Sequence, residues 1–360
     1  MKVALVTDTH FGISNDSPVH ATTIKNFFSK CFFPELKKRG ISDIIHLGDV
    51  VDVRTKISYP TLQLLKNEYI LPVVDGDYRV HQIIGNHDVY YRTSNDVSVA
   101  DVFEPYSNFS VYNEVKDIKL KDGTKVCMLP WINKNNESSV MEHLKATDSD
   151  YVMAHLEIKG ALMMKGTVSE HGQEASIFNK FKTVFTGHYH IRSVRDNIVY
   201  IGNIAHFNWG DFGEERGFAV WDTVTGDVEY VNSPYSPYKK IYYDDVSNDY
   251  SDLSVYDKVD FAGKIIKIVT VNKENPYHFD LFMQYIESKQ PYNVSVIEND
   301  ILKYHVSDDG SEVLDIDRAS IDISLTLSEY IKDFNLSEDQ NNRVSNILVG
   351  LQKEALQQTS

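Results

Sequence analysis

Short apolar runs rich in β-branched residues recur along the first 235 residues, each bounded by polar or turn-forming residues. Runs of this length are typical of buried or half-buried strands. They predict strands at residues 3–6, 44–47, 80–84, 126–129, 151–154, 183–185, 198–201 and 218–221. Apolar residues recur at helical spacing in residues 24–38 and 61–71, which predicts helices there. The alternation predicts a layered α/β fold, and the closer spacing of the later runs predicts a more antiparallel second sheet.

The pattern changes at the turn-rich run SPYSPY, residues 233–238, which predicts a domain boundary. A strand, a helix and a strand are then predicted at residues 264–271, 279–289 and 292–297. After an acidic segment without periodicity come two short amphipathic patterns with little chain left to cover them. The predicted parts are a main domain at 1–235, a small α/β cap domain at 239–305, a linker at 306–322 and a helical pair at 323–360.

Composition and charge narrow the class of protein further. No apolar run approaches the roughly 18 residues of a transmembrane helix, and the apolar stretch near the start is too short for a secretion signal. The two cysteines offer no disulfide framework, so we expect a protein of the reducing cytoplasm. The net charge is -16, with -6 on residues 1–238 and -10 on residues 239–360. Without a basic stripe, the chain would need a partner to hold nucleic acid.

Five short polar motifs follow predicted strands, at the sheet edge where α/β proteins bind ligands. They are Asp8-Thr9-His10, Gly48-Asp49, Gly85-Asn86-His87-Asp88, His155 and Gly187-His188-Tyr189-His190. Carboxylate, imidazole and amide groups form a mixed donor set suited to Mn, Fe or Zn rather than to Mg alone. The glycines before Asp49, Asn86 and His188 allow sharp turns that would aim the donors into one cavity. The motifs therefore predict a site for two divalent cations, which can activate a water and stabilise charge on a phosphoryl group.

These motifs, over residues 1–235, resemble those of the calcineurin-like metallophosphoesterases. Those enzymes have a layered β-sandwich flanked by helices. The whole layout is similar to the SbcD-type nuclease subunits of DNA repair, among them the recombination nuclease subunits of T-even-type bacteriophages. The resemblance implies two metal-binding sets: Asp8, His10 and His190 for one cation, and Asn86, His155 and His188 for the other, with Asp49 bridging them. It also implies catalytic roles for His87, which would contact the scissile phosphate and assist the leaving oxygen, and for Asp88, which would orient His87.

The resemblance implies a 3′-to-5′ exonuclease and endonuclease that attacks DNA phosphodiesters with an activated water during recombination and double-strand-break repair. It implies Mn²⁺ as the preferred cofactor, with Mg²⁺ as the alternative, and a host-cytoplasmic location if the chain is of phage origin. It further implies a homodimer formed by helices near residues 61–71 and 97–103, and an SMC-like coiled-coil ATPase bound by residues 323–360. Some family members have a histidine where this chain has Asp52. Protein phosphatases of the superfamily have an arginine where this chain has Val53.

Two other functions remain open from the residues: a small-molecule phosphodiesterase or phosphatase on the same scaffold, and a non-catalytic metal-binding scaffold. The cap domain and helical pair argue against the first, and the complete ligand set argues against the second. Outside the motifs, His46 and His81 lie in predicted strands and are expected in the core or behind the ligands. His20 and His143 are expected at the surface. His206 could line the site, although we favour a structural role.

Overall fold

The computed structural model describes residues 1–298, so the predicted linker at 306–322 and the predicted helical pair at 323–360 lie outside the described residues. The chain forms two compact units. The first contains residues 1–239, 259–266 and 288–293, and the described part of the second contains 240–258, 267–287 and 294–298. Within residues 1–298, none of the helices has the length and apolar character that crossing a bilayer requires.

The first of two six-stranded sheets has the strand order β14-β13-β1-β2-β3-β4. Its parallel strands are β1 (Lys2–Val6), β2 (Asp43–His46), β3 (Arg79–Ile83) and β4 (Phe109–Tyr112). At the other side, β13 (Gly217–Asp222) pairs antiparallel with β1, and β14 (Val228–Asn232) pairs antiparallel with β13. This sheet therefore joins the earliest and latest strands of the first unit.

Two long helical segments connect the parallel strands, as the apolar spacing predicted. After a short turn, α1 (Ile13–Asp16), the first contains α2 (Pro18–Asn26), η1 (Phe27–Phe32) and α3 (Phe33–Arg39). The second contains α4 (Tyr59–Leu65), η2 (Lys66–Ile70) and α5 (Leu71–Asp75). Both middle pieces are π-helical turns. Each precedes a helix whose second residue is proline, which cannot donate the usual backbone hydrogen bond. Another short helix, α6 (Ala100–Phe103), precedes β4.

The second sheet has the order β11-β12-β10-β7-β6-β5. Its strands are β5 (Lys116–Lys119), β6 (Lys125–Leu129), β7 (Tyr151–His155), β10 (Thr183–Gly187), β11 (Ser193–Arg195) and β12 (Ile198–Tyr200). The four central strands are parallel, and only the edge strands β5 and β11 are antiparallel. The expectation of a more antiparallel second sheet was wrong. Crossover connections allow parallel pairing: α7 (Glu137–Ala146) joins β6 to β7, and β8 (Leu162–Met164), β9 (Thr167–Val168) and η3 (Ala175–Phe178) lie between β7 and β10.

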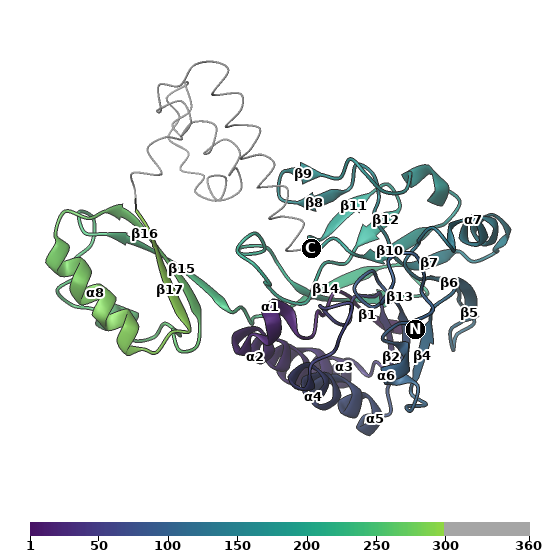
Figure 1. Cartoon of the computed structure of the whole chain (residues 1–360), viewed down its shortest axis with the longest axis horizontal. Coiled ribbons are helices and arrows are strands. Elements are labelled where there is room, and N and C mark those ends of the chain that lie inside the picture. The colour runs from purple at the N-terminus through teal and green to yellow at the C-terminus, as the bar shows by residue number, and fades with distance from the viewer. Residues whose placement is uncertain (299–360) are drawn as a thin grey trace, which may run out of the picture. The chain divides into compact units, whose positions relative to one another are not determined.

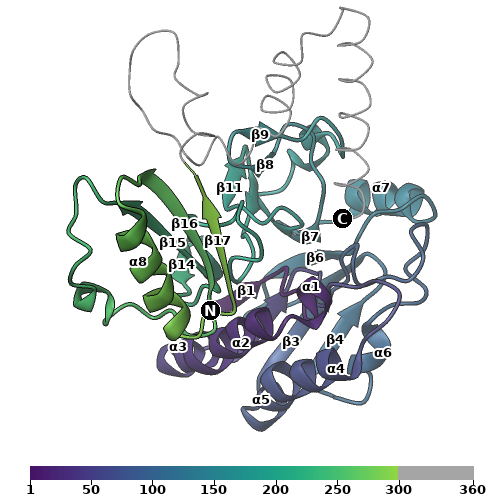
Figure 2. The ribbon, with the colours of Figure 1, turned by 60° about the vertical axis from the view of Figure 1, so that its left-hand side comes forward.

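Alternating side chains along the strands divide the core into layers. Val6 belongs to the apolar cluster that contains Phe28 and other helix residues, whereas the adjacent Leu5 clusters with Phe185 of the second sheet. The far face of that second sheet clusters with Leu144 of α7. The layers therefore run helix, sheet, sheet, helix, and Figures 1 and 2 show α2–α5 gathered on one side and α7 on another. The prediction of an α/β chain is confirmed.

Residues 238–298 contain a three-stranded sheet and one α-helix. The strands are β15 (Tyr238–Asp244), β16 (Ile265–Asn272) and β17 (Asn293–Ile297), and the helix is α8 (Pro276–Ser288). A short 3-10 turn, η4 (Ser254–Tyr256), precedes β16. Tyr243 packs against Tyr250 and Phe282, with ring centroids 4.2 and 5.3 Å apart. The strand, helix and strand expected between residues 264 and 297 are therefore present.

Candidate metal centre

The ends of five strands bring the polar motifs together. Asp8, Asp49 and Asn86 follow the parallel neighbours β1, β2 and β3, whereas His155 ends β7 and His188 follows its parallel neighbour β10. Because parallel strands end at the same edge, the motifs of each sheet are adjacent, and face-to-face packing of the sheets joins the two groups.

Asp8, His10 and His190 form the first donor set, with one donor atom of each within 4.8 Å of the others. His10 Nε2 lies 3.2 Å from His190 Nε2 and 3.9 Å from Asp8 Oδ1. The Asp8 carboxylate is fully buried, and it accepts hydrogen bonds from Thr7 Oγ1 at 2.7 Å and from the His188 backbone N–H at 3.2 Å. These bonds fix its orientation toward the two imidazoles.

Asp49, His155 and His188 form the second donor set, also within 4.8 Å of one another. Asn86 Oδ1 lies 3.0 Å from both His155 Nε2 and His188 Nδ1, and Asp49 Oδ2 lies 3.2 Å from His155 Nε2. The Leu47 carbonyl lies 2.8 Å from His155 Nδ1. Since a carbonyl only accepts hydrogen bonds, Nδ1 donates, and Nε2 is the atom that His155 offers to the set.

His87 is in neither of these two sets, but its donor atom lies within 4.8 Å of donor atoms of His10 and Asp52. Its backbone N–H donates to Asp49 Oδ1 at 2.8 Å, and its ring centroid is 5.0 Å from that of His10. Its Nδ1 lies 2.5 Å from the Asp52 carbonyl oxygen, so Nδ1 carries a proton and Nε2 is left available for other partners.

The carboxylate of Asp88, which was expected to orient His87, binds the backbone of two motif loops. It accepts hydrogen bonds from the backbone N–H groups of Val50, Val51 and Gly85, at 2.8, 3.3 and 2.9 Å. It thereby joins the loop after β2 to the loop after β3. The group that orients the His87 ring is the Asp52 carbonyl, which sequence spacing could not identify.

Four motif residues have left-handed backbone conformations: Asp8, His10, Asp49 and His188, with φ of 50, 43, 53 and 91°. Such angles cost non-glycine residues on the order of 1–3 kcal/mol each and collect at functional sites. The expected role of glycine holds for Gly48, whose φ is 94°. Gly85 is required for another reason, because a Cβ there would overlap Asp49 Oδ1 and lie 2.6 Å from Asp49 N.

The buried carboxylates of this centre need positive charge beside them. Asp8 and Asp49 are buried, and within residues 1–298 neither forms an ion pair with lysine or arginine. Burial lowers the pKa of His10, but the Asp52 carboxylate and the charges of Asp49 and Asp8 raise it to about 9. Burial likewise lowers the pKa of His155, but Asp49 raises it to about 9. Two imidazolium ions thus compensate the carboxylates, and the N/O donor set fits divalent metal ions that would replace those protons.

These pKa values predict a pH dependence of the metal-free protein. Because the folded pKa values of His10 and His155 lie above the ordinary 6.5, their protons stabilise the fold fully below pH 6.5. That stabilisation is lost as the pH rises through about 9. We expect the melting temperature in EDTA to fall across this range and the slope to flatten when Mn²⁺ is bound. Equal slopes with and without Mn²⁺ would contradict the assignment.

A comparison with known proteins decides the family. A family model for calcineurin-like phosphoesterases matches residues 1–192, more than half of the chain. This chain belongs to that family. It is also 29% identical over 245 residues to "Exonuclease subunit 1" of Enterobacteria phage T4, a match that covers 68% of this chain and 71% of that protein. The resemblance inferred from the motifs is confirmed.

Two solved structures are similar to this calcineurin-like phosphoesterase. One is an archaeal phosphodiesterase, 13% identical, with a TM-score of 0.34, covering 65% of this chain and 100% of that chain. The other is the calcineurin-like phosphoesterase YfkN from Bacillus subtilis, 12% identical, with a TM-score of 0.34, covering 64% of this chain and 88% of that chain.

Three residues beside the donor sets were not predicted from the sequence. The Trp131 ring lies 5.3 Å from that of His188, and the Phe207 ring lies 5.8 Å from that of His10. Arg216 is buried and donates a hydrogen bond to the His190 carbonyl, while Asp211 holds its guanidinium at 3.0 Å. Trp131 follows a predicted strand as the motifs do, and that position was the available signal.

Three further histidines, His46, His206 and His20, lie outside the donor sets. His46 is buried, accepts from Gly48 N–H at 3.2 Å and lies 3.1 Å from Thr9 Oγ1, so it supports two motifs from behind, as expected. Burial lowers its pKa to about 3 and keeps it neutral. His206 contacts Ser236 and a backbone carbonyl instead of the donors, in keeping with a structural role. The expectation for His20 was wrong, because it is buried 3.2 Å from the Phe207 carbonyl.

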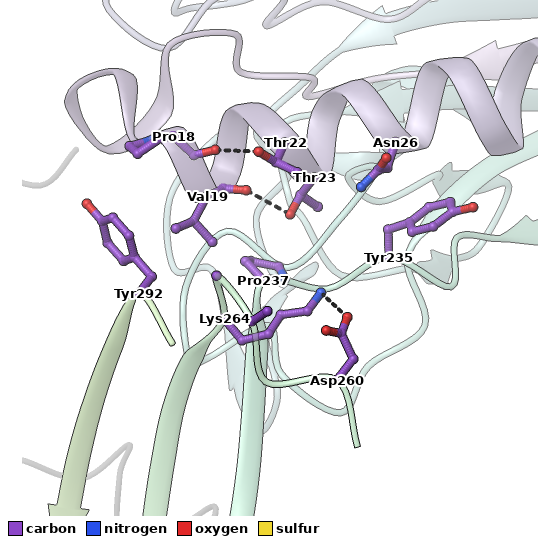
Figure 3. Close-up of a pocket in the computed structure, with 12 residues that line it drawn as sticks. Pro18, Val19, Thr22, Thr23, Asn26, Tyr235, Pro237, Asp260, Lys264 and Tyr292 are labelled. Carbon is purple, nitrogen blue, oxygen red and sulfur yellow. Dashed lines mark hydrogen bonds and ion pairs between the residues drawn. The ribbon is translucent and has the colours of Figure 1, made fainter. Parts of the chain in front are cut away.

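A separate pocket on the first unit contains none of the motif residues. Pro18, Val19, Tyr235, Pro237, Lys264 and Tyr292 are among the residues that line it (Figure 3). Several of its polar groups are paired: Thr22 and Thr23 donate to backbone carbonyls of α2, and Lys264 Nζ lies 3.7 Å from Asp260. The motif residues lie in the strand-end cluster, outside the lining of this pocket.

Proposed function

We propose that this calcineurin-like phosphoesterase is a metal-dependent DNA nuclease, with 3′-to-5′ exonuclease and endonuclease activity in recombination and double-strand-break repair. The observation that carries the proposal is the gathering of seven motif donors into two adjacent sets at the strand ends of two packed sheets. The similarity to a phage exonuclease subunit over two thirds of the chain favours DNA as the substrate.

In this proposal Asp8, His10 and His190 hold one divalent cation, Asn86, His155 and His188 hold the other, and Asp49 lies between them. Mn²⁺ is the proposed ion because the donors mix imidazole with oxygen ligands. When bound, two such cations activate a water and neutralise charge developing on the phosphoryl group. The protein supplies the rigid donor geometry through strand ends, left-handed backbone at four positions and the Asp88 bridge between loops.

His87 is proposed to act on the substrate directly. With Nδ1 bound to the Asp52 carbonyl, its Nε2 is the atom that can contact a phosphate oxygen and give a proton to the leaving oxygen. Asp88 acts as a positioning residue in this scheme, because it holds the loop that carries His87 against the loop that carries Asp49.

The proposed partner is an SMC-like coiled-coil ATPase, bound by the amphipathic segments at 323–360 in the cytoplasm. The support is the sequence pattern of those segments and the word "subunit" in the name of the phage relative. A net charge of -16 also favours a second protein that supplies the DNA-gripping surface.

The direct test is cleavage of end-labelled double-stranded DNA by the purified full chain in Mn²⁺ or Mg²⁺. We expect Mn²⁺-dependent cleavage that EDTA abolishes. Hydrolysis of bis-p-nitrophenyl phosphate with no DNA cleavage, even with an ATPase partner, would favour a small-molecule phosphodiesterase instead. Metal binding with no hydrolysis of either substrate would favour a non-catalytic scaffold.

The substitution Asp52→Asn removes one of the two contacts that Asp52 makes in the site and keeps the other. The substitution keeps the backbone carbonyl that binds His87, but it removes the carboxylate charge whose Oδ1 lies 3.4 Å from His10 Nδ1. Because such carboxylate–histidine contacts strengthen metal ligands, we expect Mn²⁺ affinity to fall about 10–100-fold. Activity at saturating Mn²⁺ should stay near that of the unsubstituted protein. A lower maximal rate with unchanged Mn²⁺ dependence would contradict this role.

The proposed homodimer contact lies on α4. Tyr59 is 89% exposed and Leu62 is 39% exposed, whereas Leu65 is buried in the helix-side core. Two apolar side chains exposed on one short helix fit a protein contact. We expect Tyr59→Glu combined with Leu62→Glu to halve the mass measured by light scattering. Val194→Glu, an exposed position on β11, is the matched control. A dimeric double variant would exclude α4.

A further inference from the structure

A second cluster of metal-binding side chains lies outside the donor sets. Asp117, Cys127 and His143 each place a donor atom within 4.8 Å of the other two. β5 and β6 pair Asp117 directly opposite Cys127, which puts both side chains on one face of the sheet. His143 comes from the last turn of α7, the helix that packs over the same face. Three separate elements therefore converge on one point.

The Asp117 carboxylate is already oriented for a ligand. Its Oδ1 accepts hydrogen bonds from Thr147 Oγ1 at 2.6 Å and from Ser149 Oγ at 2.8 Å. Its Oδ2 lies 3.1 Å from His143 Nε2. Hydroxyl groups that fix one oxygen of a carboxylate and leave the other for a metal are a common feature of metal sites. Two ligands about 2.0–2.1 Å from one zinc ion at a tetrahedral angle are roughly 3.3 Å apart, close to the observed spacing.

We propose that Asp117, Cys127 and His143 bind a single Zn²⁺ ion, which would join α7 to the β5–β6 pair. A thiolate, an imidazole and a carboxylate form a donor set suited to zinc, with water as the fourth ligand. One thiolate and one carboxylate balance the charge of the ion. The side chains of Asp117 and His143 are 34% and 30% exposed, which gives the ion access, while Cys127 is buried.

Binding would displace the Cys127 thiol proton to solvent. Burial, together with Asp117, raises the pKa of Cys127 to about 12, so without metal the side chain stays a thiol. The same cluster without metal would be a polar contact that holds α7 in place. The two alternatives differ in one observable, a metal–sulfur bond, and this bond is what the experiment must detect.

Cobalt gives that readout, because a thiolate-to-cobalt charge-transfer band arises only where sulfur binds the ion. The proposed catalytic donors contain no sulfur, and the only other cysteine, Cys31, is buried in the helix-side core. We expect Co²⁺, added to full-length protein preloaded with Mn²⁺, to produce a band that saturates at one equivalent and disappears on adding Zn²⁺. Cys31→Ser should keep the band and Cys127→Ser should lose it, with unchanged far-ultraviolet circular dichroism.

Absence of the band in the unsubstituted protein, or its persistence in Cys127→Ser, would overturn the proposal. A graded variant tests the geometry without removing a ligand. Thr147→Val deletes the hydroxyl that fixes Asp117 Oδ1, so the Co²⁺ affinity should fall about 10–100-fold. Unchanged affinity would contradict the arrangement. Each result is independent of the DNA cleavage assay, so this site and the nuclease activity stand or fall separately.

Discussion

Replacing Asp49 with alanine is expected to remove both metal binding and activity. Asp49 is buried, its Oδ2 lies 3.2 Å from His155 Nε2, and its Oδ1 accepts the His87 backbone N–H at 2.8 Å. The carboxylate thus touches the second donor set and the loop that carries His87. We expect phosphodiesterase activity to fall on the order of 10⁴-fold or more, as when one member of a catalytic unit is removed. Bound metal, measured by mass spectrometry, should be lost in parallel.

The fold itself should survive the Asp49 substitution. Burial raises the pKa of Asp88 to about 6, and the negative charge of Asp49 contributes to this rise. Removing the Asp49 carboxylate therefore relieves a like-charge interaction. Because Asp49 also raises the pKa of His10 and His155, the melting temperature of the variant in EDTA should fall below pH 9 and stay close to that of the unsubstituted protein above it. Mn²⁺ should raise the melting temperature of the unsubstituted protein and have no effect on the variant. A variant that keeps two metal ions per chain would refute the proposed central position of Asp49.

Unlike Asp49→Ala, His87→Ala is expected to keep its bound metal ions. Neither proposed ligand set contains His87, although its donor atom lies within 4.8 Å of those of His10 and Asp52, and we expect both ions to remain bound. Activity on DNA should nevertheless fall about 10²–10⁴-fold, the range for loss of a general acid or base. Metal analysis and single-turnover cleavage of labelled DNA measure the two effects. His171→Ala, a histidine outside the donor sets, is the matched control. Loss of metal from the His87 variant would show that His87 is a ligand.

A second substrate separates the two actions proposed for His87. The p-nitrophenolate of bis-p-nitrophenyl phosphate leaves without a proton, whereas the sugar alkoxide of DNA needs one. If His87 protonates the leaving oxygen, the variant should lose much more activity on DNA than on the nitrophenyl ester. Equal losses on both substrates would indicate that His87 only contacts the phosphate.

The strand positions in the main domain were predictable because they depend on local burial. All eight predicted strands are present, including β1 and β10, whose central residues are fully buried. Strands such as β5 and β14 were not predicted, because they lie at sheet edges and expose much of their length. Parallel pairing in the second sheet was also missed, since the spacing of strands along the chain does not reveal whether a connection crosses over.

The sequence by itself determined the donor types and their places at strand ends, because apolar runs report where strands finish. Only the tertiary structure decided which donors meet. His10 and His190 are 180 residues apart and come within 3.2 Å because two sheets pack face to face. The contact of the Asp52 carbonyl with His87 and the pairing of Asp117 with Cys127 likewise depend on loop conformation and strand register. Such contacts follow from the global arrangement of the chain, and no local periodicity records them.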